Sequence, residues 1–181
     1  MSDIRLEIVA LIPHLRRFAA ALTRDRGMVD DLVQDVLVRA LSKLDKFQPG
    51  TNLRAWLFTI MRNVYLSQLR KYKSRPQLTV IDAEMAGQPA SQDDTMQLRD
   101  LEQALNCLPD DQRITLLLVA LEGMSYQEAA AVTDVAVGTV RSRVARAREA
   151  LRQRLAVADP PGTDVSLPPD MKLGEGSAGN Q

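Results

Sequence analysis

Apolar side chains recur at intervals of three and four along most of the chain, which is the spacing of amphipathic helices. The pattern predicts one helix over residues 4–24, a second over 28–44 and a third over 53–72. Pro13 interrupts the first of these patterns and predicts a break or a new helix start. No segment shows the alternating pattern of a β-strand, so we expect an all-α protein.

Residues 76–95 show no hydrophobic period and include Gly, Pro, Ser and Asp, which predicts a flexible acidic linker. This linker divides the chain into a first helical domain over 1–75 and a second over 96–156. The tail, residues 157–181, has almost no core-forming side chains and is expected to be disordered. A length of 181 residues accommodates two small helical domains joined in this way.

The second predicted domain contains a candidate helix-turn-helix. Gly123 can end one helix in the left-handed conformation, and Ser125 with Glu128 can form a capping box for a short helix over 126–132. A tight turn then leads into a helix over 137–155. One side of that last helix is apolar, and the other presents Thr139, Ser142, Ala145 and Arg146, flanked by Arg141 and Arg148. Such a face suits the major groove of DNA, whereas the alternative is an exposed helix made soluble by arginines.

The formal net charge of zero conceals a segregation of charge along the chain. Residues 1–75 contain 14 Lys/Arg and 7 Asp/Glu, a net charge of +7, and residues 76–112 contain 1 and 8, a net charge of −7. Residues 113–156 carry +3 and residues 157–181 carry −3. Basic segments suit a polyanion because phosphate contacts release counterions, although charge alone indicates two solvated surfaces equally well.

Several classes of protein are excluded by composition. No apolar run approaches the roughly 20 residues that cross a bilayer, and the N-terminus lacks the order of a signal peptide, so we expect a cytoplasmic protein. One cysteine, Cys107, excludes an intrachain disulfide, and one histidine, His14, leaves little for a catalytic triad or a metal site. We therefore expect no cofactor, no metal, no catalytic residues and no enzyme activity, with Cys107 a small buried side chain.

Two surfaces of the first domain are candidates for binding. Asp31, Gln34, Asp35 and Val38 share one face of the second predicted helix and form an acidic patch in a basic domain. Such a patch suits a basic protein surface or a divalent ion, and the alternative is solvated acids that the helix dipole favours. The third predicted helix interleaves cations with aromatic side chains, a combination that suits unpaired bases, although the spacing of Trp56 favours a core position.

Several short sequences resemble the extracytoplasmic-function (ECF) sigma factors. The sequences DLVQD at 31–35, NLRAWLF at 52–58 and RN at 62–63 resemble the second conserved region of that family. The sequences SYQEAA at 125–130 and VGTVRSR at 137–143 resemble the fourth region. The order of the motifs and the linker between them also match. The stretch from Phe47 to Phe58 is similar to the alphaproteobacterial general-stress subgroup.

The resemblance implies a sigma factor that binds core RNA polymerase and directs transcription initiation at promoters. It implies binding to the clamp helices of the largest polymerase subunit for Asp31, Gln34, Asp35 and Val38. It implies contact with the −10 element for Phe47, Asn52, Arg62, Asn63, Arg70 and Lys71. It implies contact with the −35 element for Thr139, Arg141, Ser142, Arg143 and Arg146. An anti-sigma factor is a further partner that the resemblance implies.

Two other functions are compatible with parts of the sequence. A helix-turn-helix regulator that binds its operator without polymerase would leave the acidic patch of the first domain without a role. An enzyme with a metal held by Asp31 and Asp35 is disfavoured because His14 and Cys107 are the only other ligands of their types.

Overall fold

The computed structural model describes residues 4–23, 27–73 and 92–158, and all regular structure in these ranges is helical. Before residue 74 the elements are α1 (Ile4–Leu22), α2 (Gly27–Ser42), a short 3-10 helix η1 (Leu44–Lys46) and α3 (Leu53–Lys73). After residue 91 they are α4 (Gln92–Asn106), α5 (Asp110–Ala120), α6 (Tyr126–Thr133) and α7 (Val137–Ala158). The prediction of an all-α chain is confirmed for these residues.

The helix ends agree with the sequence chemistry at several positions. The side chain of Asn52 accepts a hydrogen bond from the backbone N–H of Ala55 at 2.9 Å and so caps α3. Ser125 and Glu128 form the expected capping box at the start of α6. Gly123 has a φ of +64°, the left-handed conformation that glycine adopts without strain. Most of the predicted linker and tail lies outside the described residues, but α4 begins at Gln92 and α7 extends to Ala158.

The predicted break at Pro13 is wrong, because α1 continues through this residue. The carbonyl that loses its helical partner belongs to Val9, and both Val9 and Pro13 are exposed to solvent. Ile8 and Leu15 are buried on either side of it and anchor both halves of α1 to the core. Packing of these anchors therefore outweighs the local cost of one proline.

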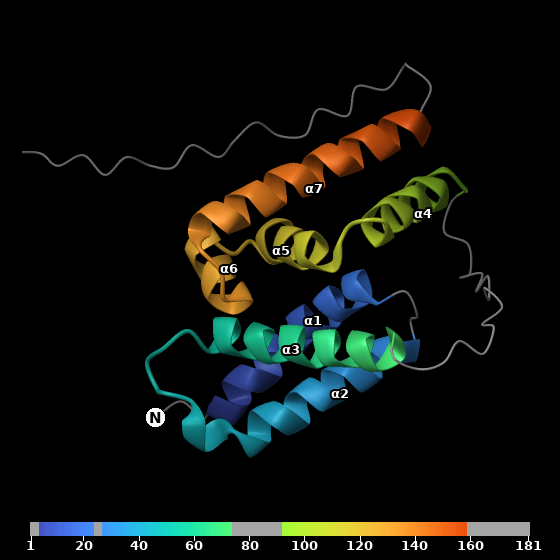
Figure 1. The fold of residues 1–181 in the computed structure, drawn as a ribbon. Coiled ribbons are helices and arrows are strands. Elements are labelled where there is room, and N and C mark those ends of the chain that lie inside the picture. Colours follow the sequence, from blue (N-terminus) through green and yellow to red (C-terminus); the bar gives the residue numbers. More distant parts are fainter. Residues whose placement is uncertain (1–3, 24–26, 74–91, 159–181) are drawn as a thin grey trace, which may run out of the picture.

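Helix α3 lies between α2 and α6, and α1 crosses behind α3 and packs against α2, α3 and α5 (Figure 1). Helix α7 lies on the outer side of α5 and α6, next to α4. The buried apolar side chains of both predicted domains belong to one cluster. No sequence pattern predicted this packing of one domain on the other.

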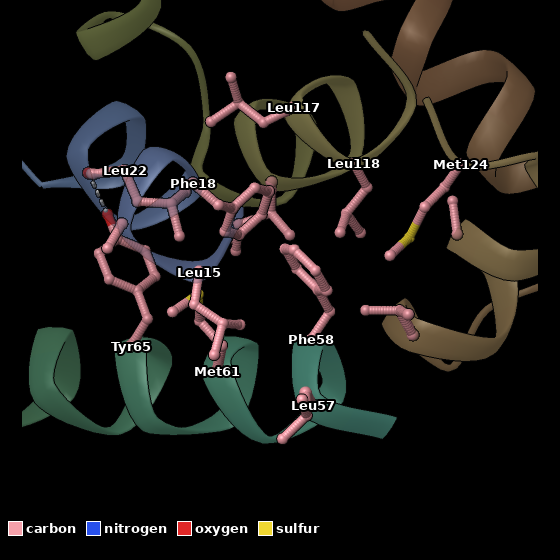
Figure 2. Packing of buried hydrophobic residues seen from close by; sticks show 14 of the residues in the cluster. Leu15, Phe18, Leu22, Leu57, Phe58, Met61, Tyr65, Leu117, Leu118 and Met124 are labelled. Carbon is pink, nitrogen blue, oxygen red and sulfur yellow. Dashed lines mark hydrogen bonds between the residues drawn. The ribbon is translucent and has the colours of Figure 1, made fainter. Parts of the chain in front are cut away.

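Phe58 stands where the two predicted domains meet. Its ring makes an edge-to-face contact with Phe18 of α1, with ring centroids 5.0 Å apart. Figure 2 shows Leu118 and Met124 of the second domain above it, on the side away from Leu57. Phe58 and Leu118 are fully buried, so water is excluded from this junction.

Candidate functional site

The predicted core-polymerase residues lie together on the outward face of α2. Asp31, Gln34, Asp35 and Val38 are all exposed, and Val38 retains 67% of its accessible surface. Asp35 accepts a hydrogen bond of 3.1 Å from the amide nitrogen of Gln68 on α3. The three polar residues line a shallow concavity between α2 and α3. Within the described part of the chain, no group of three or more His, Cys, Asp or Glu side chains is placed to hold a metal ion.

The predicted −10 residues do not form one continuous patch. Arg62, Asn63 and Arg70 line a second concavity on α3, which Asp110 of α5 also borders. The remaining members of the set lie elsewhere: Asn52 at the start of α3, Lys71 in the concavity beside the α2 residues, and Phe47 in the loop before α3.

Phe47 differs from the other members of the predicted −10 set because it is buried. It is only 8% exposed, and its ring packs against Trp56 with centroids 5.2 Å apart. This contact holds Phe47, at the start of the loop that precedes α3, against Trp56 of α3. Phe47 therefore shapes this loop from within the protein.

The predicted −35 residues follow α7, whose inner stripe of Val140, Val144 and Ala147 is buried as expected. Arg141 and Arg146 are exposed on the outer side, while Thr139 and Ser142 are half-buried. The Ser142 hydroxyl donates to the Thr139 carbonyl at 3.0 Å. The turn before α7 depends on Asp134, whose φ of 54° places it in the left-handed region.

Arg143 differs from the other arginines of this set. Its guanidinium donates to the Asp111 carboxylate of α5 at 2.8 Å, and its side chain is 19% exposed. This ion pair joins α7 to α5. Arg143 is thus half-buried and paired with α5, whereas Arg141 and Arg146 are exposed.

Three polar contacts join α3 to the second domain, and none was predicted. At its start, Asn52 donates to the Glu128 carboxylate at 2.8 Å. Two residues later, Arg54 donates to the Glu122 carboxylate at 2.8 Å and also to the Glu122 carbonyl. Further along, Arg113 of α5 donates to the Tyr65 hydroxyl.

Glu122 is the centre of the largest of these contacts. Its side chain is fully buried, and its carboxylate also accepts hydrogen bonds from Arg17 at 2.9 and 3.1 Å. His14 Nδ1 lies 3.0 Å from the same carboxylate. A buried carboxylate needs such partners because the loss of hydration is otherwise uncompensated. The only sequence signal was an acidic residue directly after an apolar run, which does not reveal its partners.

Arg113 is a second buried charge at this junction. Its side chain is 3% exposed, and its guanidinium lies over the Tyr65 ring at 5.8 Å. It donates to Asn106 at 3.0 Å and to Asp110 at 3.2 Å. The Tyr65 hydroxyl in turn donates to the Leu22 carbonyl at 3.2 Å, which Figure 2 shows as a dashed line. This chain of bonds links α5 to α1 through α3.

Two remaining expectations concern single residues and membranes. The expectation of a buried Cys107 is wrong, because this residue is exposed in the turn between α4 and α5, where Leu108 is the buried neighbour. His14 is a structural residue of α1, as expected, through its contact with Glu122. In the ranges that the structure covers, no helix is both long enough and apolar enough to span a membrane.

The chain matches two family models, one in each half. Residues 8–62 match the Sigma2 domain of PhyR, and residues 98–151 match Sigma-70, region 4. The chain is also 45% identical over 162 residues to the ECF RNA polymerase sigma factor EcfG of Rhodopseudomonas palustris (strain TIE-1). That alignment covers 86% of this chain and 87% of the relative.

Two solved structures are similar in fold and in sequence. One is the sigma factor RpoE from Bartonella quintana in complex with the anti-sigma factor NepR, with 38% identity, a TM-score of 0.69 and coverage of 88% of this chain and 100% of that one. The other is CnrH in complex with the cytosolic domain of CnrY, with 30% identity, a TM-score of 0.65 and coverage of 87% and 92%. The similarities to EcfG and to the PhyR domain agree with the general-stress subgroup that the sequence resembled.

Proposed function

This chain belongs to the ECF family of RNA polymerase sigma factors. We propose that it binds its polymerase and the two promoter elements through three different helices. As a member of this family it binds core RNA polymerase and directs promoter-specific initiation in transcription. In our proposal α2 binds the polymerase, α3 contacts the −10 element and α7 contacts the −35 element. The protein acts in the cytoplasm and is not an enzyme.

The observation that carries the proposal is the exposed face of α2. Asp31, Gln34, Asp35 and Val38 remain open to solvent although the second domain covers much of α3. Carboxylates around an exposed apolar side chain suit a basic protein surface, because charge complementarity orients the partner and the apolar contact adds affinity. An operator-binding regulator has no use for this face.

The assignment of α3 and α7 rests on charge and shape. Arg62, Asn63 and Arg70 line one concavity on α3, where an unpaired base and its phosphates can be held together. Arg141 and Arg146 project from the outer side of α7, where bidentate contacts with guanine are possible in a major groove. We further propose an anti-sigma partner, since the solved relatives RpoE and CnrH were each captured with another protein.

Run-off transcription with purified core polymerase tests the proposal. We expect wild-type protein to confer start-site selection and to bind promoter DNA far more tightly with core than alone. Replacement of Asp31 and Asp35 by Lys reverses the charge of the α2 face, and we expect core affinity to fall about a hundredfold, because like charges across an interface cost several kcal/mol.

A matched control is Glu7→Lys, which reverses an exposed acid on α1 outside the proposed surface. We expect this variant to retain core affinity. Retained affinity in the Asp31 and Asp35 double variant would refute the assignment of α2. Tight promoter binding by the protein alone, without start-site selection by polymerase, would instead support an operator-binding regulator.

A further inference from the structure

One stripe of α3 changes character along the helix. Leu57, Met61 and Val64 follow one another at intervals of four and three residues, and all three are fully buried. The same spacing continues to Gln68, which is half-buried, and to Lys71, which is exposed. The stripe that packs α3 into the core therefore continues as a polar stripe over the last two turns of the helix.

These last turns of α3 face the first turns of α2 across the concavity between the two helices. Gln68, Lys71 and Tyr72 line it from α3, and Asp31 and Asp35 are among the residues that line it from α2. The side-chain amide of Gln68 donates to Oδ2 of Asp35 at 3.1 Å. This bond crosses the concavity and ties α3 to one of the two carboxylates that we assign to polymerase binding. A carboxylate held in this way has fewer orientations open to it than a freely rotating one.

We propose that Gln68 is a positioning residue for Asp35, and that the last two turns of α3 belong to the surface that binds core polymerase. The inference rests on the proposed function of α2 and extends it to a second helix. A carboxylate that is oriented before the partner arrives loses less freedom on binding, so more of its attraction to a basic side chain of the polymerase is retained as affinity.

The position of Lys71 favours the polymerase surface over the −10 surface, for which it was predicted. Lys71 follows Arg62 by nine residues, and at about 3.6 residues per turn this interval places the two on opposite sides of α3. Arg62 accordingly lines the concavity that Asp110 borders, whereas Lys71 lines the concavity beside α2. Its positive charge there reduces the attraction of the carboxylates for a basic partner.

Tyr72 extends the same surface with an aromatic side chain. It retains 64% of its accessible surface and lines the concavity together with Gln68 and Lys71. Exposed tyrosines are enriched in protein interfaces, because the ring supplies apolar contact area and the hydroxyl tolerates water. Val38 of α2 is exposed to a similar degree, so an apolar side chain accompanies the carboxylates on each of the two helices.

The first test measures the affinity of the full chain for purified core polymerase. Gln68→Ala releases the Asp35 carboxylate, and we expect the affinity to fall about threefold to tenfold, because a side chain that has lost its anchor must be ordered on binding. In an Asp35→Ala background the same substitution should have no further effect, because Gln68 acts through that carboxylate. Equal losses in both backgrounds would show a role that does not depend on Asp35, such as a merely structural one, and would overturn the inference.

A matched control removes the same kind of bond elsewhere. The side-chain amide of Gln153 donates to the Glu149 carboxylate at 2.7 Å on the exposed side of α7. Gln153→Ala should therefore leave core affinity unchanged. A loss as large as that of Gln68→Ala would show that the effect is not specific to the surface of α2 and α3, and would count against the inference.

The second test compares two neighbouring cations of α3. Lys71→Ala removes a positive charge that faces a basic partner, and we expect core affinity to rise about twofold to threefold. Binding of a single-stranded −10 oligonucleotide by the holoenzyme should not change. Arg70→Ala should have the reverse pattern, with weaker oligonucleotide binding and unchanged core affinity, because Arg70 lines the other concavity. If Lys71→Ala weakens oligonucleotide binding as strongly as Arg70→Ala does, Lys71 belongs to the −10 surface and its reassignment is wrong.

The outcomes distinguish this inference from the proposed function. If replacement of Asp31 and Asp35 by Lys abolishes core binding while Gln68→Ala retains full affinity, then α2 binds the polymerase without help from α3 and only the inference is wrong. If the double Lys variant itself retains core affinity, the proposed surface on α2 is wrong, and the inference that extends it is overturned as well.

Discussion

Helices α3 and α7 both carry arginines that were predicted to contact promoter DNA, yet α3 lies between helices of both domains while α7 is outermost. Along α7 the apolar stripe takes the inner side, and Arg141 and Arg146 remain exposed. Along α3, Arg70 is exposed and Arg62 is half-buried, whereas Arg54, which was not in the predicted set, is 31% exposed and paired with Glu122 of the other domain. An arginine-rich helix sequence therefore indicates positive charge, whereas the neighbouring helices decide whether that charge is exposed to a ligand.

The reason for the difference is the position of each helix in the stack. Helix α3 lies between α2 and α6 and also packs against α1, while α7 is outermost (Figure 1). A central helix buries side chains on two sides. Its polar groups therefore contact acidic side chains and backbone carbonyls of the helices on both sides. An outer helix buries one stripe and leaves the remainder in water.

The largest expected effect tests the central position of α3. Phe58→Ala removes a ring that contacts Phe18 and lies at the junction of the two domains, and we expect a loss of about 3–5 kcal/mol in the free energy of unfolding. Val144→Ala on the inner stripe of α7 should cost less, about 2 kcal/mol, because fewer buried methyl groups are lost. Urea denaturation measures both. Equal losses would contradict the contrast between a central and an outer helix.

A smaller effect sharpens the comparison within α7 itself. Arg146→Ala should weaken binding of −35 duplex DNA by about 1–3 kcal/mol and relax base preference, while core binding is retained. Arg143→Ala should instead destabilise the second domain by about 0.2–1 kcal/mol, because its pair with Asp111 is only partly screened from water. Competition binding with mutated duplexes and thermal melting separate the two.

The control for these variants is Arg154→Ala, which removes an exposed arginine near the end of α7. It should lower DNA affinity uniformly or not at all, without a change in base preference. If Arg143→Ala relaxes base preference as strongly as Arg146→Ala, then Arg143 leaves Asp111 on binding and reads bases.

The last expected effect, similar in size to the loss of the Arg143 pair, concerns the cap of α6, which also contacts α3. Ser125→Ala should cost about 1 kcal/mol of stability, the usual effect of losing an N-cap side chain. The pKa of Glu128 is lowered, first by the hydrogen bond from the Ser125 backbone and then by the Ser125 hydroxyl. Since the folded pKa lies below the unfolded one, this contribution to stability is complete above the unfolded pKa and is lost as the pH falls through the folded pKa.

Acid titration of stability therefore measures the cap. Between about pH 5 and about pH 3, wild-type protein should lose stability that Glu128→Gln does not lose, because the amide does not titrate. Ser125→Ala should keep most of this pH dependence, since the backbone N–H remains. Parallel acid profiles for wild type and Glu128→Gln would show that the hydrogen bonds to Glu128 do not perturb its pKa.

Helix caps and helix faces could be predicted from the sequence wherever the residues that determine them are close in the chain. The capping box of Ser125 and Glu128 spans three residues, and the inner stripe of α7 follows helical spacing. The exposed acidic face of α2 follows from the same periodicity. Prediction was wrong at Pro13 and Cys107, where packing and the path of a turn override local preference.

By itself the sequence determined the helices, their caps, the helix-turn-helix and the family, because each depends on residues within a few positions or on short motifs. Only the tertiary structure decided that Glu122 is buried among cations of the first domain, 68 residues from Arg54 and 108 from His14. The physical reason is that the sequence determines which side chains are ionisable. Their exposure to water and their partners depend on segments that only folding brings together.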